Sequence, residues 1–411
     1  MPFGEFVALM ATMTALVALS IDMILPALPA IGATLGVRRA NDSQLIVSLL
    51  FLGFGLGQFF YGPVSENLGR KPAVYIGLAL FSAGCLLALL ARSFPMMLVG
   101  RVLQGVGVGG PRAMTIALVR DKFEGRAMAR VMSLVMAVFI LVPVIAPSIG
   151  QAVLVRSGWR TIFGVYLTLG LVVWVWFAWR QEETLAPARR IPLSVGNIVR
   201  GVRDVVTNRL AVGYTMAAGL VYGAFIGYLS SVQQILQQQY ALGPRFPLYF
   251  ATLAVALGGA SLCNAQLVGR HGMRPLAGRA LKLVCAASLV FLVIVASRAG
   301  HPPLWALMAY LLASFFGIGL LFGNLNALAM QPLGHIAGIG AAVVGGSSTL
   351  ISLALGTVIG QSYDNTVLPL VAGFAILSGL AMAVIRFAEA SGRVTGVERP
   401  GNGATAYPPK P

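Results

Sequence analysis

The sequence predicts an all-α membrane protein with twelve transmembrane helices in two pseudo-symmetric bundles of six. Three observations predict this fold class. Hydrophobic residues make up 58% of the 411 residues and charged residues only 10%, whereas soluble domains carry about 25% charged residues. Twelve apolar runs reach the roughly 20 residues that a helix needs to cross a bilayer. A short Gly/Arg/Pro pattern also recurs at half the chain length.

The twelve apolar runs fall into two groups of six, separated by the longest polar connection. The first group runs Phe6–Ile31, Ser43–Tyr61, Ala73–Leu90, Met96–Leu118, Met128–Val155 and Thr161–Ala178. The second group runs Leu210–Ile235, Phe246–Val268, Leu276–Ala296, Leu304–Met330, Ile339–Ser362 and Val367–Phe387. We therefore expect an N-terminal six-helix bundle over residues 1–180, a cytoplasmic linker over 181–209, a C-terminal six-helix bundle over 210–388 and a disordered cytoplasmic tail over 389–411.

The formal net charge of +17 bears on orientation rather than on nucleic acid binding. The basic residues lie in short loops between apolar runs, which indicates the positive-inside bias and contact with anionic lipid. Of the 29 Lys and Arg residues, 20 fall on the side of the two termini, seven on the other side, and Arg101 and Arg112 within the fourth run. Both termini are therefore expected in the cytoplasm, with no nucleic acid as a partner.

The sequence offers little support for an enzyme, a metal site or a cofactor. The cysteines Cys85, Cys263 and Cys285 all lie in apolar runs and have no metal-ligand spacing. No Walker A sequence, HExxH motif or convincing nucleophile–base pattern occurs. The stretch from Gly105 to Gly110 matches G-x-G-x-x-G, but inside an apolar run its small residues favour close helix packing. The N-terminus lacks signal-peptide features, so the first run is expected to be retained.

Asp22 is the first candidate functional residue, because it is the only acid deep within an apolar run. A charged group at mid-bilayer costs about 2.5–3.5 kcal/mol, so such residues usually face a partner or a water-filled cavity. Asp22 could instead cap a helix, or form an ion pair that only locks two helices together.

Two arginines in the fourth run are candidates for its partner. Counted from the ends of their runs, Asp22 lies about 13 Å and Arg101 about 8 Å from the outer boundary, so the two could approach each other. Arg112 follows Arg101 by eleven residues, close to three helical turns, which places both on one face. That face could line water, or Arg112 could reach the cytoplasmic head groups instead.

The two halves carry related sequences after their second runs. The first reads Gly62 to Pro72, with Glu66, Asn67, Gly69, Arg70 and Lys71, and the second reads Val268 to Pro275. Aligning Gly69 with Gly272 gives similar Gly/Arg/Pro spacing at an offset of 203 residues. Such a repeat is typical of transporters built from two parallel-related halves. We expect both stretches to be loops.

The first of these stretches resembles motif A of the major facilitator superfamily, usually written G-x-x-x-D-R-x-G-R-R. Gly62, Glu66, Gly69, Arg70 and Lys71 match it, with Glu66 in place of the aspartate and Asn67 in place of the first arginine. The resemblance implies charge-assisted bonds to neighbouring helices that steady the outward-facing state. The change at Asn67 removes part of that network.

Further stretches resemble the drug–proton antiporters of this superfamily. Arg101, Gln104 and Gly105 resemble its motif B, R-x-x-Q-G, which is tied to proton transfer. Asp22 to Pro29 resembles the D-M-Y-L-P-A-L-P signature of the Bcr/CflA drug-resistance group. Other matches to that group are Val119-Arg120-Asp121, Ala146-Pro147-x-x-Gly150, and Gln331-Pro332 through Ala337-Gly338 into Gly345-Gly346-Ser347.

These residues suggest proton–substrate exchange. Burial favours the neutral form of a carboxylic acid and a nearby arginine favours the charged form, so a modest rearrangement could switch Asp22. Protonation would release Arg101, and substrate binding would favour loss of the proton. Some multidrug relatives carry a second acid two turns earlier, where this chain has Thr14. A neutral or singly charged substrate is therefore expected.

Few other polar groups lie in the runs, and each is a candidate for the substrate cavity. Tyr222, Gln233, Asn324 and Asn326 are selected, with Gln44, Gln58 and Gln234 also noted. Pockets for varied ligands are mostly apolar with a few placed polar groups. Hydrogen bonding between helices explains the same residues at least as well.

Pro143, Pro147 and Gly150 lie where the superfamily's antiporters carry a Gly/Pro motif in the fifth helix. Proline removes an intrahelical bond and bends the helix. The bend could favour closure toward the cytoplasm, or be static.

Taken with the resemblance, the sequence indicates a monomeric multi-pass transporter of a bacterial inner membrane. It would export small, mostly apolar drugs of the amphenicol or bicyclomycin type, using the proton gradient and no cofactor. One alternative is an exporter of an endogenous metabolite such as a sugar, an amino acid derivative or a siderophore. Another is a non-transporting membrane sensor, although such a protein has no need of the deep charges.

Overall fold

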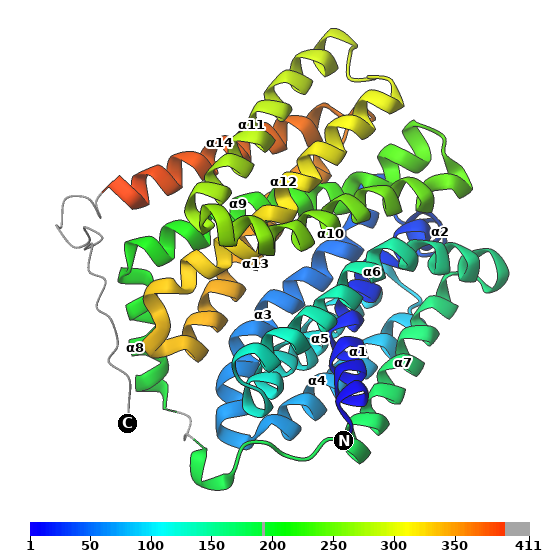
Figure 1. The fold of residues 1–411 in the computed structure, drawn as a ribbon. Coiled ribbons are helices and arrows are strands. Elements are labelled where there is room, and N and C mark those ends of the chain that lie inside the picture. The colour runs from blue at the N-terminus through cyan, green and yellow to red at the C-terminus, as the bar shows by residue number, and fades with distance from the viewer. Residues whose placement is uncertain (191–193, 391–411) are drawn as a thin grey trace.

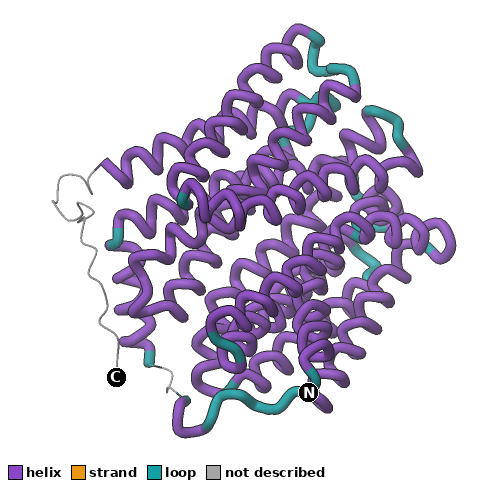
Figure 2. Tube along the Cα trace, in the orientation of Figure 1, coloured by secondary structure: helices purple, strands orange, loops and turns teal. Residues whose placement is uncertain are grey.

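The computed structural model describes residues 1–190 and 194–390, and within them the chain is helical with no strand (Figure 2). Twelve membrane passes follow the predicted runs. In order, they are formed by α1 (Phe3–Asp22) with α2 (Leu28–Thr34), α3 (Leu45–Leu68), α4 (Arg70–Leu89), α5 (Phe94–Lys122), α6 (Gly125–Ser157), α7 (Trp159–Arg180), α9 (Arg209–Gln233), α10 (Phe246–His271), α11 (Met273–Ser297), α12 (Leu304–Met330), α13 (Ala337–Gln361) and α14 (Leu368–Ala390). A 3-10 turn, Gln331–Ile336, separates α12 from α13.

The twelve passes form two bundles with matching internal contacts. In the N-terminal half, α4 packs on α5, α3 on α5, α4 on α7 and α1 on α6. In the C-terminal half the counterparts are α11 on α12, α10 on α12, α11 on α14 and α9 on α13. The two bundles lie side by side in Figure 1. The halves are therefore pseudo-symmetric in packing as well as in sequence.

The halves meet along two helix pairs, α3 with α13 and α6 with α10. Because the number of passes is even, the start of α1 and the end of α14 lie on one side of the bundle, here called the terminal side, and the opposite side is the far side (Figure 1). The linker contains a further helix, α8 (Val195–Thr207), which packs on α13 and α9 at the terminal side.

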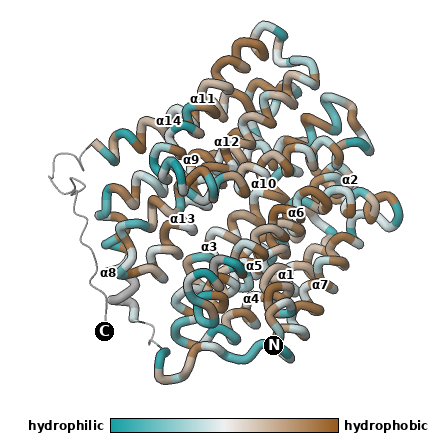
Figure 3. Tube along the Cα trace, viewed as in Figure 1, coloured by the Kyte–Doolittle hydropathy of each residue, from teal (hydrophilic) through white to brown (hydrophobic). Residues whose placement is uncertain are grey.

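Apolar side chains cover the outside of the bundle as well as its core. Figure 3 shows hydrophobic residues along the helices and hydrophilic residues gathered at their ends and in the linker. Val293 is 70% exposed and Leu248 66% exposed. Such surfaces are expected where hydrocarbon rather than water surrounds the protein.

The first pass differs from the prediction of one continuous run. It breaks directly after Asp22, passes through a 3-10 turn over Leu25–Ala27 and resumes as α2. Pro26 explains the position, because a proline ring clashes with the carbonyl four residues earlier, which here belongs to Asp22. Asp22 therefore lies at a helix end inside the membrane rather than mid-helix.

The predicted loops after the second and eighth passes are also wrong. Helix α3 continues to Leu68, so Gly62 and Glu66 are helical, and α10 continues to His271. The turns are single glycines with positive φ, Gly69 at 113° and Gly272 at 77°, a conformation that favours glycine. The two glycines aligned from the sequence therefore occupy equivalent turns.

The predicted limits of the bundles, the linker and the tail stay predictions. Residues 389 and 390 still belong to α14, and the rest of the expected tail, 391–411, lies outside the described residues. The linker over 181–209 includes α8 and the 3-10 turn Pro187–Arg189, while 191–193 lie outside the described residues.

Candidate functional site

The break in the first pass places a carboxylate where helical hydrogen bonding ends. Asp22 is the last residue of α1 and is only 4% exposed. Among the described residues, no hydrogen bond or ion pair to its carboxylate occurs within the usual distances. A buried acid without a partner inside a membrane protein marks a candidate functional site.

Arg101 is anchored beside this break rather than paired with Asp22. Its guanidinium is completely buried and donates through Nε to the carbonyl of Ile46 at 2.8 Å, through Nη1 to Oε1 of Gln104 at 2.8 Å and through Nη2 to the carbonyl of Ser20 at 2.8 Å. Ser20 precedes Asp22 by two residues. Arg101 thus bonds to the backbone at the end of α1, and the approach of Arg101 to the Asp22 carboxylate stays a prediction.

The unwound end of α1 explains why these groups gather there. The last carbonyls of a helix lack intrahelical partners and carry a partial negative charge. Arg101 satisfies the Ser20 carbonyl, while the Leu19 carbonyl accepts from the Met23 N–H at 3.1 Å and, in addition, from the hydroxyl of Tyr166 on α7 at 3.0 Å. Gln104 also donates to Sγ of Cys85 on α4 at 3.0 Å. We call Asp22, Arg101, Gln104 and Tyr166 the helix-break site.

Two glycines allow the surrounding helices to approach the helix-break site closely. A Cβ at Gly150 of α6 would lie 1.9 Å from the Met23 carbonyl oxygen, and one at Gly105 of α5 would lie 2.0 Å from the Leu50 carbonyl oxygen of α3. Backbone lies against backbone at both contacts, so a side chain could be accepted only by moving a helix. Gly105 therefore allows close helix packing, which is the role expected from the sequence for the small residues of the G-x-G-x-x-G stretch.

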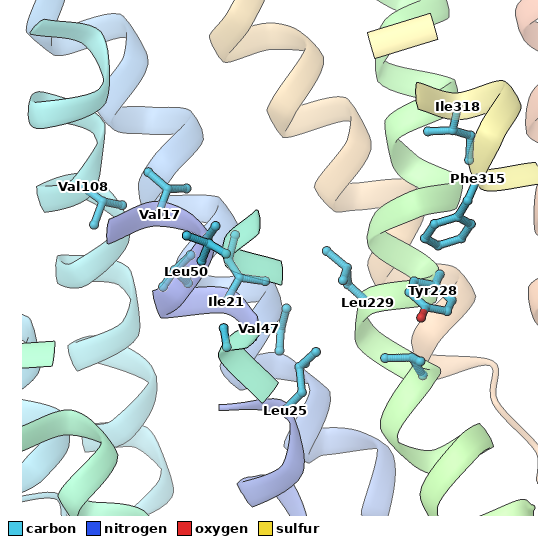
Figure 4. Close-up of a cluster of buried hydrophobic side chains, with 14 of the residues drawn as sticks. Val17, Ile21, Leu25, Val47, Leu50, Val108, Tyr228, Leu229, Phe315 and Ile318 are labelled. Carbon is cyan, nitrogen blue, oxygen red and sulfur yellow. The ribbon is translucent and has the colours of Figure 1, made fainter. Parts of the chain in front are cut away.

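Across the boundary between the halves, Tyr228 of α9 belongs to the same buried cluster as Ile21, the residue before Asp22 (Figure 4). Its hydroxyl is buried and has no hydrogen-bond partner, as is also true of the Thr14 hydroxyl in α1. Figure 4 shows Tyr228 beside Phe315, with Leu229 extending from α9 toward the side of Ile21 and Val47. Tyr228 was not among the residues selected from the sequence, because nothing in the sequence shows that its hydroxyl lacks a hydrogen-bond partner.

Arg112 occupies a different environment from Arg101. Its guanidinium lies over the ring of Phe139 on α6, 4.9 Å from the centroid, and the side chain is partly exposed. It lies ten residues, about 15 Å, before the end of α5 at Lys122. From the sequence, Arg112 was expected either to line water or to reach the cytoplasmic head groups. The contact with the Phe139 ring is an environment that neither expectation included.

The four selected cavity residues mostly bond within the C-terminal half. Tyr222 donates to the Phe322 carbonyl at 2.6 Å, and Asn326 donates to the Tyr222 hydroxyl at 3.0 Å. Asn324 donates to Oδ1 of Asn264 at 2.7 Å, joining α12 to α10. Gln233 donates to Gln237 at 3.0 Å. Interhelical bonding, the alternative anticipated from the sequence, thus describes Tyr222, Asn324 and Asn326, although Oδ1 of Asn326 stays without a partner.

A cluster of amides joins the halves on the far side, and we call it the amide clasp. Asn41 donates to the carbonyls of Gln361 and Tyr363 at 3.0 and 2.8 Å. Gln361 donates back to the Asn41 carbonyl at 2.8 Å, and Gln234 donates to Oδ1 of Asn41 at 2.9 Å. Gln44 also donates to Gln234.

Sequence reasoning missed part of the amide clasp. Asn41 and Tyr363 lie between the apolar runs, so they were not considered as membrane residues. A usable signal was the row of glutamines from Gln233 to Gln239, which lies at a π-helical turn over Gln234–Gln239. Such turns occur frequently at functional positions.

The motif A residues form a network on the terminal side with two acids, Asp121, which was noted from the sequence in another motif, and Glu183, which was not selected. Arg70 pairs with Asp121 at 3.1 Å, and Glu183 accepts from the backbone N–H groups of Arg70 and Lys71 at 3.0 and 2.9 Å. Glu183 thereby caps α4, where the helix dipole favours an anion. Lys71 also donates to the Ala178 carbonyl at 3.1 Å.

Glu66 and Gly62 face the other half instead. A Cβ at Gly338 would lie 2.6 Å from Oε1 of Glu66, and one at Gly62 would lie 3.8 Å from Cβ of Ala342. Glu66 therefore lies at the N-terminal end of α13, an end that attracts negative charge. In the fifth pass, Pro143 and Pro147 are accommodated within a continuous α6, and the bend expected there stays a prediction.

The helix-break site combines a buried carboxyl group, a buried guanidinium held on backbone carbonyls, and a phenol. Among residues 1–190 and 194–390, no group of three or more His, Cys, Asp or Glu side chains is placed to hold a metal ion. The titratable and cationic groups of the site sit where α1, α3, α5 and α7 meet.

Comparison with known proteins agrees with this architecture. The model of the Major Facilitator Superfamily matches residues 10–357. The chain is 29% identical over 344 residues to the uncharacterized MFS-type transporter YdgK of Bacillus subtilis (strain 168), covering 83% of this chain and 84% of that protein. It is 27% identical over 366 residues to the multidrug resistance protein MdtL of Salmonella heidelberg (strain SL476), covering 87% and 89%.

Among solved structures, the xylose transporter XylE from E. coli, in a partially occluded inward open conformation, superposes with a TM-score of 0.71. Its sequence is 12% identical, and the match covers 98% of this chain and 99% of that one. At this identity, the likeness concerns the fold.

Proposed function

The chain belongs to the major facilitator superfamily and is a membrane transporter rather than an enzyme, and on this premise we propose that it exports small, mostly apolar drugs in exchange for protons. Compounds of the amphenicol or bicyclomycin type are the expected substrates. The proposal extends to a monomer in a bacterial inner membrane with both termini in the cytoplasm, in accordance with the distribution of Lys and Arg.

The observation that carries the proposal is the unpartnered Asp22 at the end of α1. A charged carboxylate is expensive in this position, because it is buried and lies at the negative end of a helix. The nearest cation bonds to the Ser20 carbonyl instead. Each of these features disfavours a permanent negative charge and supports Asp22 as the proton carrier.

The same geometry suggests how the proton is linked to conformation. With Asp22 protonated, Arg101 stays on the carbonyls of Ser20 and Ile46, as it does here. After the proton leaves, the carboxylate competes for the guanidinium, which would draw α5 and the unwound end of α1 into a new arrangement. Charge-assisted hydrogen bonds are about twice as strong as neutral ones, which favours this exchange.

A set of aromatic residues in the C-terminal half supports an apolar substrate. It comprises Tyr222, Phe225, Tyr228, Phe250, Phe315 and Phe322, with adjacent ring centroids 4.6 to 6.4 Å apart. We call it the aromatic cluster. It contains no charged side chain, and its Tyr228 belongs to the same buried cluster as Ile21, the residue before Asp22 (Figure 4). This combination suits a neutral or singly charged aromatic compound.

The relatives favour drugs over metabolites. The match to MdtL, a protein named for multidrug resistance, extends over 87% of this chain. That likeness supports the assignment to drug export without specifying a compound. In this conformation the amide clasp holds the halves together on the far side, so we assign the clasp to the periplasmic closure of an exporter.

The test is proton-driven flux in proteoliposomes with an imposed pH gradient. Wild type and Asp22→Asn would be compared with a panel of amphenicols, bicyclomycin and lipophilic cations. We expect wild type to accumulate at least one compound against its gradient, and Asp22→Asn to lose that accumulation at least about tenfold while still exchanging the compound passively. The matched control is Glu124→Gln, an exposed acid before α6, which should behave as wild type.

Each other outcome identifies a specific error. If Asp22→Asn still couples flux to protons, Asp22 is structural and the mechanism is wrong. If no drug moves but a sugar, amino acid derivative or siderophore does, the proposed substrate class is wrong. Proton coupling would then be tested by comparing wild type and Asp22→Asn with that compound.

A further inference from the structure

A groove on the far side lies outside the helix-break site. It opens between α6 and α10, one helix from each half, and its volume is about 630 Å³. The residues that line it are Ser148, Gln151, Ala152, Val155, Arg156, Pro244, Pro247, Leu248 and Ala251. Val155 is 75% exposed and Leu248 66% exposed, so the mouth of the groove faces the surrounding bilayer.

The lining combines an apolar wall with one exposed arginine and one buried amide oxygen that has no hydrogen-bond donor. Arg156 is the only charged residue of the lining, and it takes part in no ion pair among the described residues. Nearby Arg160 is already engaged, because it donates to the Ala91 carbonyl and stacks on Trp159. The side-chain oxygen Oε1 of Gln151 is buried in the groove wall and lacks a hydrogen-bond donor.

The spacing of these groups follows the layers of a bilayer. Arg156 is the last residue but one of α6, and Gln151 lies five residues, about 7–8 Å, deeper. The polar layer on each side of the hydrocarbon core is about 5–8 Å thick. Arg156 thus sits at head-group depth, Gln151 near the start of the hydrocarbon, and the apolar residues lie alongside.

We propose that this groove binds an anionic phospholipid whose head group carries free hydroxyls, as in phosphatidylglycerol. Arg156 would bind the phosphate, and an acyl chain would lie along Val155, Leu248 and Ala251. A rotation of the Gln151 side chain would bring its buried Oε1 to a head-group or glycerol hydroxyl, which would donate to it. A cation without an acidic neighbour selects a negative head group over a zwitterionic one. Because the walls belong to different halves, the bound lipid would bridge them in this conformation.

Native mass spectrometry of the full chain in detergent tests the proposal directly. The protein would be titrated with phosphatidylglycerol or phosphatidylcholine of identical acyl chains. We expect wild type to retain one phosphatidylglycerol at least about fivefold more often than phosphatidylcholine. Arg156→Ala should lose this preference, Arg156→Lys should keep most of it, and Ala251→Trp, which fills the groove, should lose the bound lipid although the charge remains.

The matched control is Arg298→Ala, which removes an exposed arginine from the far side away from the groove and should bind as wild type does. Equal retention of phosphatidylglycerol by wild type, Arg156→Ala and Ala251→Trp would overturn the proposal. So would an equal loss in Arg298→Ala, because the preference would then depend on overall charge. Since binding is read without transport, failure here leaves the proposed drug export untouched.

Discussion

The two halves share a packing plan but differ in what they bury. Among the described residues, the buried charged side chains are Asp22, Arg70 and Arg101, and all three belong to the N-terminal half. The buried polar side chains of the C-terminal half are uncharged, and the aromatic cluster also belongs to that half. Ionic chemistry and adaptable apolar surface are thus separated between the halves.

Two interfaces differ in how their glycines are used. At the α3/α5 interface of the N-terminal half, Gly53 and Gly105 bring backbone against backbone. At the α9/α13 interface of the C-terminal half, Gly219, Gly223 and Gly227 receive the side chains of Ile351, Leu355 and Ile359. The counterpart of the α3/α5 interface, α10 with α12, keeps a backbone contact, because a Cβ at Gly319 would lie 2.5 Å from the Leu257 carbonyl oxygen. The contrast therefore separates these two interfaces rather than the whole halves.

The largest expected effect compares the buried polar groups of the two halves. Arg101→Leu would leave the carbonyls of Ser20 and Ile46 and the amide of Gln104 without their donor. We expect a loss of about 3–5 kcal/mol in the free energy of unfolding. Asn324→Leu, which removes a bond to Asn264, should cost about 1 kcal/mol.

Unfolding in mixed micelles, followed by tryptophan fluorescence, would measure both variants. Four of the five tryptophans lie in α7, namely Trp159, Trp174, Trp176 and Trp179, so the signal reports mainly on the N-terminal half. Similar losses in Arg101→Leu and Asn324→Leu would contradict the contrast drawn between the halves.

An intermediate effect is expected from matched glycine substitutions. A Cβ at Gly105 would lie 2.0 Å from a backbone oxygen of α3, whereas one at Gly223 would lie 3.0 Å from Cβ of Leu355. Gly105→Ala should therefore destabilise by about 1–3 kcal/mol, and Gly223→Ala by less, about 1 kcal/mol or below, because Leu355 need move only slightly. The same unfolding assay distinguishes them, and a larger loss for Gly223→Ala would show that the α9/α13 interface is the more rigid of the two.

Hydropathy alone located the twelve passes, because a bilayer requires long apolar runs. For α12 the expected and observed bounds coincide at Leu304–Met330. The pattern failed where helices leave the apolar layer, as at Glu66, since a polar residue lowers hydropathy without ending the helix. A hydropathy window also does not register a single proline such as Pro26. It therefore did not show the helix break after Asp22.

The site was predicted in part for a related reason. Asp22 and Arg101 are conspicuous because charges are rare in apolar runs, and the structure brings both to the end of α1. The sequence could not show that Arg101 bonds to backbone carbonyls, because those groups become available only where a helix unwinds. Asn41 was missed because it acts from a loop, and its partner Gln361 lies 320 residues away.

The smallest expected effect concerns Arg112. This residue can show whether the charges of the N-terminal half serve proton coupling or stability. Its guanidinium stacks on Phe139 and is partly exposed, so Arg112→Gln should change the free energy of unfolding by less than about 1 kcal/mol. A small stability change together with reduced proton-driven flux would assign Arg112 to a water-lined path. A change as large as that of Arg101→Leu would instead mean that buried charge in this half is held for stability, and the division between the halves would no longer separate coupling from substrate binding.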